Sequence, residues 1–411
     1  MMTICLLFIL IYPAAANEIS IDANGSQHLS SLERARMLTV PTAKDVQNAE
    51  YEHASFWDDH GPLLHVAWKE WELTSLDKST EPEFLNPQLS DAINEVFANP
   101  TNENEAAVQS QWRSTYLDAN NKTKPLPEGV YATQLLTPSG ISYIRGLLDQ
   151  AAKSGIPTRR PNGMNRNGLI LDYKVNGAVP TSPLMDVVEK EIIDSVVRPV
   201  GRLLFQHYVR CNDDVEYFAF TIRFDGVYDD DTAVFEDQVR DVELNEHRDA
   251  SVITLNVNLN LPDEEYEGSD VYFREFPYSA SGKDTLASAS ESKKSYEEYE
   301  GSDVYFREFP YSASGKDTLA SASESKKSYV RFTPGMAIIH LGAHRHGSIA
   351  ISSTENKYQR SARYNLVIWL FGEHGDVRIT PYPKEEQMNA VERWHGCTSV
   401  GGMMSNIHNF V

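Results

Sequence analysis

Hydrophobic and polar residues alternate along the segment S-V-I-T-L-N-V-N-L-N-L, residues 251–261. One set of positions is apolar: Ile253, Leu255, Val257, Leu259 and Leu261. The positions between them are polar: Thr254, Asn256, Asn258 and Asn260. Successive side chains of a β-strand point to opposite faces, so this pattern predicts a strand with one face in a packed core. The row of amides on the other face suits a wet, polar cleft.

Two segments before this strand have the spacing of amphipathic helices. The first covers residues 138–154, with Thr137 as N-cap, Pro138 as the first helical residue and Gly155 as the stop signal. The second covers residues 183–198, and Pro199 is expected to break or kink it. Strands are expected in P-E-G-V-Y-A-T-Q-L-L, residues 127–136, and in Y-F-A-F-T-I-R-F, residues 217–224.

Residues 17–125 form a mostly helical N-terminal region of unknown role. Apolar periodicity predicts helices around three tryptophans and over residues 85–97. His60 and His65 lie among those tryptophans. A packed amphipathic helix explains these histidines better than metal binding does.

A short motif ahead of the alternating strand places His247 and Asp249 two residues apart. In an extended backbone they face the same side, so an imidazole and a carboxylate can hold one ion. The segment from Gly335 to Leu370 supplies a third ligand, and Arg363 opens a strand within it. Two histidines and one carboxylate form the facial triad of non-haem Fe(II) oxygenases, which leaves coordination positions open.

The chain has 411 residues and a formal net charge of −22. The length allows one large domain or two to three smaller ones. The negative charge argues against nucleic acid as a partner, because phosphate contacts need clustered Lys and Arg. The acidic segment 225–246 has no regular calcium-ligand spacing with a turn glycine, so a solvated loop is favoured over a calcium site.

The N-terminal residues 1–16 have the pattern of a secretory signal peptide, with an apolar run at 4–12 and three alanines before Asn17. The segment before that run has no Lys or Arg, which leaves a signal anchor or a gene-model error as alternatives. The run is too short to span a bilayer comfortably, so we expect no stable membrane span after cleavage. The pattern predicts the ER lumen or secretion, and a glycoprotein with sequons at Asn24 and Asn121.

Removal of residues 1–16 leaves two cysteines, Cys211 and Cys397. They either form one disulfide that ties the tail to the main domain or remain two buried thiols.

A perfect tandem duplication interrupts the second half of the chain. Residues 264–296 recur without a change as residues 297–329. One copy is expected to contribute E-G-S-D-V-Y-F to a sheet, and the other to form a loop or a spare hairpin. The sequence does not say which copy does which.

Six motifs occur in order along residues 126–372: R-P-N-G-M-N-R-N-G-L-I-L, Y-F-A-F-T-I-R-F, H-R-D-A-S-V-I-T-L-N-V-N-L, Y-E-G-S-D-V-Y-F, P-G-M-A-I-I-H-L-G-A-H-R-H-G and R-Y-N-L-V-I-W-L. Together they resemble the prolyl 4-hydroxylase-like branch of the Fe(II)/2-oxoglutarate dioxygenases, and most of all its oxygenase domain-containing proteins. The resemblance implies an α+β fold built on a double-stranded β-helix, a jelly roll supported by helices at 138–154 and 183–198. It divides the chain into a signal peptide (1–16), an N-terminal region (17–125), an oxygenase domain (126–375) and a tail (376–411).

By this resemblance His247, Asp249 and His346 are the metal ligands, with His344 and His340 as nearby rivals. Arg363 corresponds to the arginine that holds the distal carboxylate of 2-oxoglutarate, and a rigid guanidinium fork suits that task. A surface ion pair is the alternative for Arg363.

Two asparagines and one phenylalanine affect the expected binding of 2-oxoglutarate. Asn365 lies on the same strand face as Arg363 and is expected to assist it. Asn258 either reaches the co-substrate or makes core hydrogen bonds. Phe224 stands where the family often has Tyr, which removes one hydrogen bond to 2-oxoglutarate. Extra residues between His346 and Arg363, like the duplication, change the spacing but fit as loops.

The implied activity is hydroxylation of a peptide or protein side chain, prolyl or lysyl, with release of succinate and CO2. Fe(II), 2-oxoglutarate and L-ascorbate are the implied cofactors. Three alternatives remain: a catalytically decayed binding module, a cupin-type metalloprotein with another metal, and an oxygenase of small molecules. Arg363 and Asn365 argue against a simple cupin, and the complete ligand set argues against decay. The sequence does not predict the oligomeric state.

Overall fold

The computed structural model describes residues 29–40, 54–75, 82–117, 122–159, 168–174, 185–211, 216–225, 242–264, 266–274, 327–352, 362–372 and 387–397. The predicted signal peptide, the sequons at Asn24 and Asn121, and most of the acidic segment lie outside these residues. No helix among the described residues is long and apolar enough to cross a membrane.

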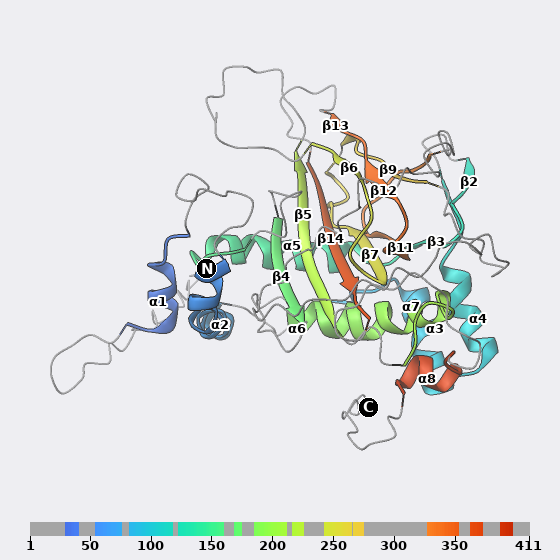
Figure 1. Cartoon of the computed structure of the whole chain (residues 1–411), viewed down its shortest axis with the longest axis horizontal. Coiled ribbons are helices and arrows are strands. Elements are labelled where there is room, and N and C mark those ends of the chain that lie inside the picture. The colour runs from blue at the N-terminus through green and yellow to red at the C-terminus, as the bar shows by residue number, and fades with distance from the viewer. Residues whose placement is uncertain are drawn as a thin grey trace, which may run out of the picture.

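Two antiparallel sheets form the centre of the molecule (Figure 1). The large sheet has the order β3-β11-β7-β14-β5-β4. Its strands are β3 (Val130–Gln134), β4 (Gly168–Lys174), β5 (Tyr217–Asp225), β7 (Ile253–Asn258), β11 (Met336–Leu341) and β14 (Ala362–Leu370). The small sheet has the order β10-β9-β12-β6. Its strands are β6 (Leu244–His247), β9 (Val271–Phe273), β10 (Ser328–Val330) and β12 (His346–Ser348).

The chain passes between the two sheets in the order of a jelly roll. From β5 onward, β5, β7, β11 and β14 lie in the large sheet, and β6, β9, β10 and β12 lie in the small one. Two short pairs complete the strands, β1 (Thr115–Leu117) with β2 (Thr123–Pro125) and β8 (Glu267–Gly268) with β13 (Ile351–Ser352). The predicted α+β class with antiparallel sheets is confirmed.

Strand β7 lies between β11 and β14 and confirms the alternation read from the sequence. Its apolar residues Ile253, Leu255 and Val257 are buried in the core that the supporting helices cover. Helix α7 approaches this strand closely at Gly201, where a Cβ would lie 2.6 Å from the Cδ1 atom of Ile253. A larger residue at that position would require the Ile253 side chain to move.

The first supporting helix, α5 (Pro138–Lys153), begins as predicted. The Gly140 N–H donates to the Thr137 hydroxyl at 3.0 Å, which caps the helix. The second begins as α6 (Met185–Val187), continues as the π-helical η1 (Val188–Val197) and ends as α7 (Arg198–Leu204). Of the two effects expected at Pro199, a break does not occur, because α7 follows η1 directly. Proline is tolerated in the first turn of a helix, and Pro199 occupies the first turn of α7 after the π-helical segment.

The N-terminal helices pack on this framework. They are α1 (Ser31–Arg36), α2 (Ala54–Ser75), α3 (Pro87–Ala98) and α4 (Asn102–Gln111). Trp57, Trp68 and Trp71 are buried in one cluster with Ala151 of α5, as expected for a packed amphipathic helix. Apolar residues of α3 and α4 lie in the same core as the outer face of the large sheet.

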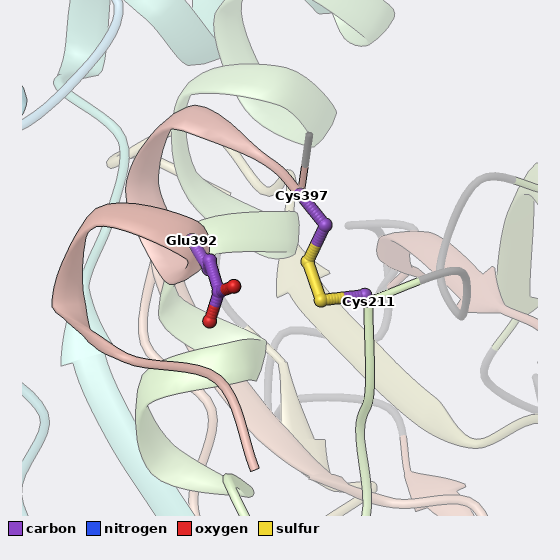
Figure 2. A group of neighbouring side chains, drawn as sticks. All are labelled: Cys211, Glu392 and Cys397. Carbon is purple, nitrogen blue, oxygen red and sulfur yellow. A yellow bond between two sulfur atoms is a disulfide. The ribbon is translucent and has the colours of Figure 1, made fainter. Parts of the chain in front are cut away.

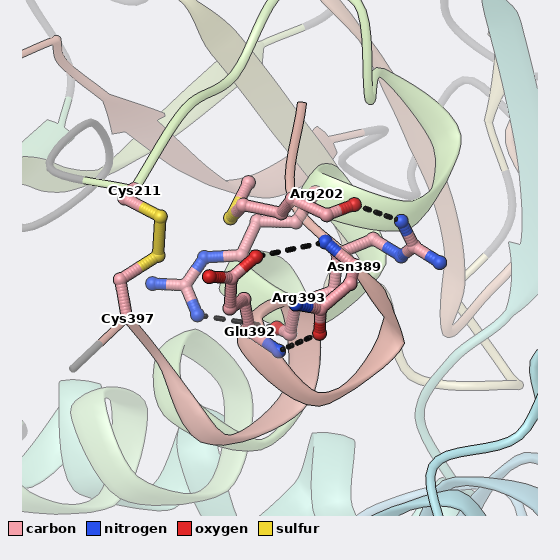
Figure 3. The surroundings of a disulfide bond; sticks show 7 residues. Arg202, Cys211, Asn389, Glu392, Arg393 and Cys397 are labelled. Carbon is pink, nitrogen blue, oxygen red and sulfur yellow. Dashed lines mark hydrogen bonds between the residues drawn. A yellow bond between two sulfur atoms is a disulfide. The ribbon is translucent and has the colours of Figure 1, made fainter. Parts of the chain in front are cut away.

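A disulfide joins Cys211 and Cys397, which decides between the two alternatives that the sequence left open (Figure 2). It anchors the C-terminal helix α8 (Ala390–His395) beside the end of α7. Glu392 lies next to the disulfide and accepts a hydrogen bond from the Asn389 N–H, which closes a capping box. Arg202 of α7 donates to the carbonyl of Arg393 at 3.1 Å (Figure 3).

A buried ion pair also holds α8 in place. Glu105 of α4 is 4% exposed. Its carboxylate accepts hydrogen bonds from Arg393 Nε at 2.7 Å, Arg393 Nη2 at 2.6 Å and Trp394 Nε1 at 3.0 Å. A bidentate pair with a third donor compensates well for the loss of hydration.

The small sheet uses both copies of the duplication. The first copy supplies β8 and β9, and the last residues of the second copy, Ser328 and Tyr329, lie in β10. Strands β9 and β10 are neighbours, with Tyr272 paired to Tyr329. Residues 275–326 between them lie outside the described residues.

We predict that Glu105→Gln lowers the free energy of unfolding by about 3 kcal/mol, because it leaves the Arg393 guanidinium buried without its counterion. Urea denaturation measures this loss. The control is Glu103→Gln on the exposed face of α4, for which the expected change is within about 0.5 kcal/mol. Equal effects of the two substitutions would contradict the role assigned to this pair.

Candidate active site

The fold brings His247, Asp249 and His346 together at one end of the small sheet. His247 ends β6, Asp249 follows in the connection to β7, and His346 begins β12 directly opposite His247. Their potential ligand atoms all lie within 4.8 Å of one another. Asp249 Oδ1 is 3.3 Å from His247 Nε2, and Asp249 Oδ2 is 3.6 Å from His346 Nε2.

Backbone carbonyls orient both imidazoles. His247 Nδ1 lies 2.7 Å from the carbonyl of Asn245, and His346 Nδ1 lies 2.9 Å from the carbonyl of His344. A proton on each Nδ1 satisfies these contacts and leaves each Nε2 with a lone pair directed at the site. Histidine ligands are typically fixed by such a hydrogen bond from the other ring nitrogen.

The two rival histidines lie nearby but outside this group of ligand atoms. His344 Nε2 faces the carbonyl of Arg274 at 2.5 Å, which turns that ring away from Asp249. His340 is fully buried, and its Nε2 lies 3.9 Å from Asp249 Oδ2. Burial lowers the pKa of His340 to about 3, and its Nδ1 contacts the carbonyl of Leu341, so it is a neutral ring behind the carboxylate.

Asp249 is a buried anion with several partners. Burial alone would raise its pKa, but His346, His247 and His340 together hold it well below the usual range. The Thr254 hydroxyl donates to Asp249 Oδ2 at 2.6 Å, and the Ser251 hydroxyl lies 2.8 Å from that of Thr254. The Asp249 N–H donates to the carbonyl of Gly342. The carboxylate is thus oriented before any ion binds.

A cavity between the two sheets extends from this site. It is lined by Ile222, Phe224, Leu244, Asn256, Val271, His346, Gly347, Ser348, Arg363 and Asn365. Arg363 is 1% exposed, its guanidinium lies over the Phe224 ring at 4.4 Å, and its Nη1 donates to the carbonyl of Ser269. This environment differs from that of a surface ion pair. Burial lowers the pKa of Arg363 to about 10, so the side chain remains a cation at neutral pH.

The predicted amides divide between two places. Asn365 lines the cavity next to Arg363, and its Nδ2 donates to Asn256 Oδ1. Asn258 is not among the residues that line this cavity. Its Nδ2 donates to the Tyr266 hydroxyl at 2.9 Å, and its Oδ1 accepts the Asn260 N–H at 2.7 Å. Of the two roles considered for Asn258, the structure shows the hydrogen bonds of a core amide.

Sequence reasoning did not single out Thr254 or Ser348. Thr254 stood on the polar face of the alternating strand, and Ser348 stands two residues after His346 on the same strand face. Each residue could have been found from the sequence, because each lies on a strand within a few residues of a candidate metal ligand.

The donor set fits a divalent transition metal. Two imidazoles from the paired strands β6 and β12, and one carboxylate from the connection after β6, match the ligands that Fe(II) takes in a facial triad.

We predict that Thr254→Val weakens metal binding by about 10- to 100-fold, because it removes the hydroxyl that orients Asp249 while keeping the side-chain volume. Titration of the metal-free protein with Mn(II) under anaerobic conditions measures the affinity. Thr133→Val provides a matched buried control on β3, away from the site, with the affinity expected to stay unchanged. An unchanged affinity in Thr254→Val would show that this hydroxyl is dispensable.

Metal affinity should also depend on pH through His247. Burial acts to lower the pKa of His247, but the hydrogen bond and charge of Asp249 raise it overall above the ordinary value. Below that raised pKa the ring carries a proton that a metal must displace. Affinity should therefore be full above the pKa of His247 and fall about tenfold for each pH unit below it. Mn(II) titrations from roughly pH 6 to 9 test this around the ordinary value of about 6.5. A flat profile across that range would contradict it.

Comparison with known proteins agrees with this geometry. No family model matches the chain. It is 22% identical over 250 residues to 2-oxoglutarate and iron-dependent oxygenase domain-containing protein 2 of Xenopus tropicalis, covering 61% of this chain and 50% of that protein. It is 22% identical over 251 residues to 2-oxoglutarate and iron-dependent oxygenase domain-containing protein CP2 of Arabidopsis thaliana, covering 60% and 46%. The matched region thus spans about half the length of these relatives.

Similar solved structures include a 2OG-Fe(II) oxygenase family oxidoreductase from Burkholderia pseudomallei, with 10% identity and a TM-score of 0.34, covering 61% of this chain and 86% of that one. A Pseudomonas putida prolyl-4-hydroxylase matches with 8% identity and a TM-score of 0.30, covering 69% and 97%. The chain is thus similar over its matched region to 2-oxoglutarate and iron-dependent oxygenase domain-containing proteins, and its His-Asp-His group is the donor set that an Fe(II)-dependent oxygenase uses.

Proposed function

We propose that the chain is an Fe(II)- and 2-oxoglutarate-dependent dioxygenase that hydroxylates a prolyl or lysyl side chain of a peptide or protein and releases succinate and CO2. One observation carries the proposal. His346, a member of the His247-Asp249-His346 group, and the buried Arg363 line the same cavity.

Each group at the site has a separate task. His247, Asp249 and His346 would hold iron, which when bound supplies the activation of O2. Arg363 offers a fixed positive charge to the distal carboxylate of 2-oxoglutarate. The guanidinium is kept in place by the Phe224 ring and by the carbonyl of Ser269. The apolar side chains of Ile222, Leu244 and Val271 line the same cavity and leave few groups there that can hydrogen-bond to water.

The peptide substrate rests on the resemblance of the ordered motifs to the prolyl 4-hydroxylase-like branch. The secretory pathway as the site of action rests on the pattern of residues 1–16, and a requirement for ascorbate rests on the same resemblance. These are proposals about the whole protein, and each needs its own experiment.

Succinate formation tests the central proposal without knowledge of the substrate. We expect the purified chain with Fe(II) and ascorbate to convert 2-oxoglutarate slowly to succinate. His247→Ala should abolish the turnover by removing a ligand, and Arg363→Ala should reduce it by at least about tenfold by removing the carboxylate partner. Quantification of succinate by mass spectrometry measures both effects.

Two substitutions away from the site serve as controls. His395→Ala on α8 and the exposed Arg113→Ala should leave turnover unchanged. Absence of turnover together with absence of 2-oxoglutarate binding in the unsubstituted chain would reject the enzyme and favour a decayed binding module. Turnover that is insensitive to His247→Ala would place the reaction elsewhere.

A further inference from the structure

One hydroxyl in the cavity has no assigned task. Ser348 on β12 is 4% exposed and lines the cavity that contains Arg363. Its Oγ has no hydrogen-bond partner among the described residues. A buried hydroxyl without a partner costs free energy, so such a group in a cavity points to a ligand that it binds.

Strand geometry gives the position of this hydroxyl relative to the metal site. Ser348 follows His346 by two residues on β12, so both side chains are directed to the same face of the small sheet. Two residues of a strand extend roughly 6.7 Å. His346, Ser348 and Arg363 all border this cavity, so a short dicarboxylate bound in it between His346 and Arg363 can reach the Ser348 side chain.

The other residues that line the cavity offer few side-chain groups that could donate a hydrogen bond to a ligand. Ile222, Phe224, Leu244 and Val271 have no hydrogen-bonding group in their side chains. Asn365 Nδ2 donates to Asn256 Oδ1, and Asn365 Oδ1, a buried acceptor without a partner among the described residues, cannot donate to a carboxylate. Among the described residues that line the cavity, Ser348 supplies the hydroxyl, and Arg363 Nε is likewise a buried donor with no partner. The Ser348 hydroxyl and Arg363 Nε are therefore two donors that could bind the same carboxylate group.

We propose that the Ser348 hydroxyl donates a hydrogen bond to the distal carboxylate of the co-substrate alongside Arg363, and that it helps select a 2-oxo dicarboxylate over a 2-oxo monocarboxylate. This inference rests on the proposed function. Phe224 contributes only its ring to the guanidinium, so Ser348 supplies a hydroxyl on the opposite sheet of the same cavity.

The test is a binding cycle between residue and ligand. Mn(II)-loaded protein is titrated anaerobically by calorimetry with 2-oxoglutarate and with 2-oxopentanoate, in which a methyl group replaces the distal carboxylate. Ser348→Ala should weaken 2-oxoglutarate binding about tenfold, the usual effect of losing one hydrogen bond to a charged group. The same substitution should change the affinity for 2-oxopentanoate, and that for Mn(II), by less than about twofold. Ser352→Ala on the exposed end of β13 is the matched control and should change neither affinity.

Each contrary result has a distinct meaning. An unchanged 2-oxoglutarate affinity in Ser348→Ala, or an equal loss for both ligands, would overturn the role of this hydroxyl. If Arg363→Met loses 2-oxoglutarate binding in that same series, the proposed function stands without Ser348. If the unsubstituted protein binds Mn(II) but not 2-oxoglutarate, the proposed function fails and this inference fails with it.

Discussion

The buried carboxylate of Asp249 is the constraint on which the site depends. An isolated anion with 6% exposure would cost several kcal/mol in lost hydration. Three imidazoles and the Thr254 hydroxyl surround this one, so β6, β7, β11 and β12 must all meet at the same point. The raised pKa of His247 shows that a proton can act as counterion there. A divalent cation would replace that proton with a larger charge, which links metal binding to the stability of this corner of the fold.

The same constraint explains where the chain accommodates its duplication. Phe273 of β9 lies against the rings of His340, His344 and His346, and Val271 lines the cavity, so β9 must hold its register beside β12. The first copy provides these residues. Most of the duplicated sequence, residues 275–326, falls along the chain between β9 and β10, which are neighbours in one sheet. Extra length between two paired strands adds a loop-closure cost that grows slowly with length, whereas a change within β9 would move the histidine packing.

Local rules predicted the local features of the fold, and contacts between distant residues decided the rest. The period of two gave β7 and its buried face, and the Thr137-Pro138 signal gave the start of α5, because each depends on neighbours in sequence. The choice among His340, His344 and His346 depends on which ring faces Asp249, and that is set by the pairing of β12 with β6. The disulfide, the partners of Asn258 and the extension of the helix past Pro199 depend on the same kind of contact. A π-helical segment before a proline has no clear signature in a single sequence.

The positive charges at the metal site and at Arg363 determine which ligands the cavity favours. A divalent metal with the Asp249 carboxylate carries one net positive charge, and the neutral imidazoles add none. Arg363 adds a second positive charge at the other end, in a position too buried for water to screen well. Burial lowers the pKa of Arg363, and Tyr266 and Asp270 act in the opposite direction. A ligand with a carboxylate at each end places an anion beside each of the two charges, whereas a monocarboxylate places an anion beside only one of them. Selection for a dianion therefore follows from the separation of charge along the cavity, and a hydrogen-bond donor beside Arg363 sharpens it by fixing where the second carboxylate lies.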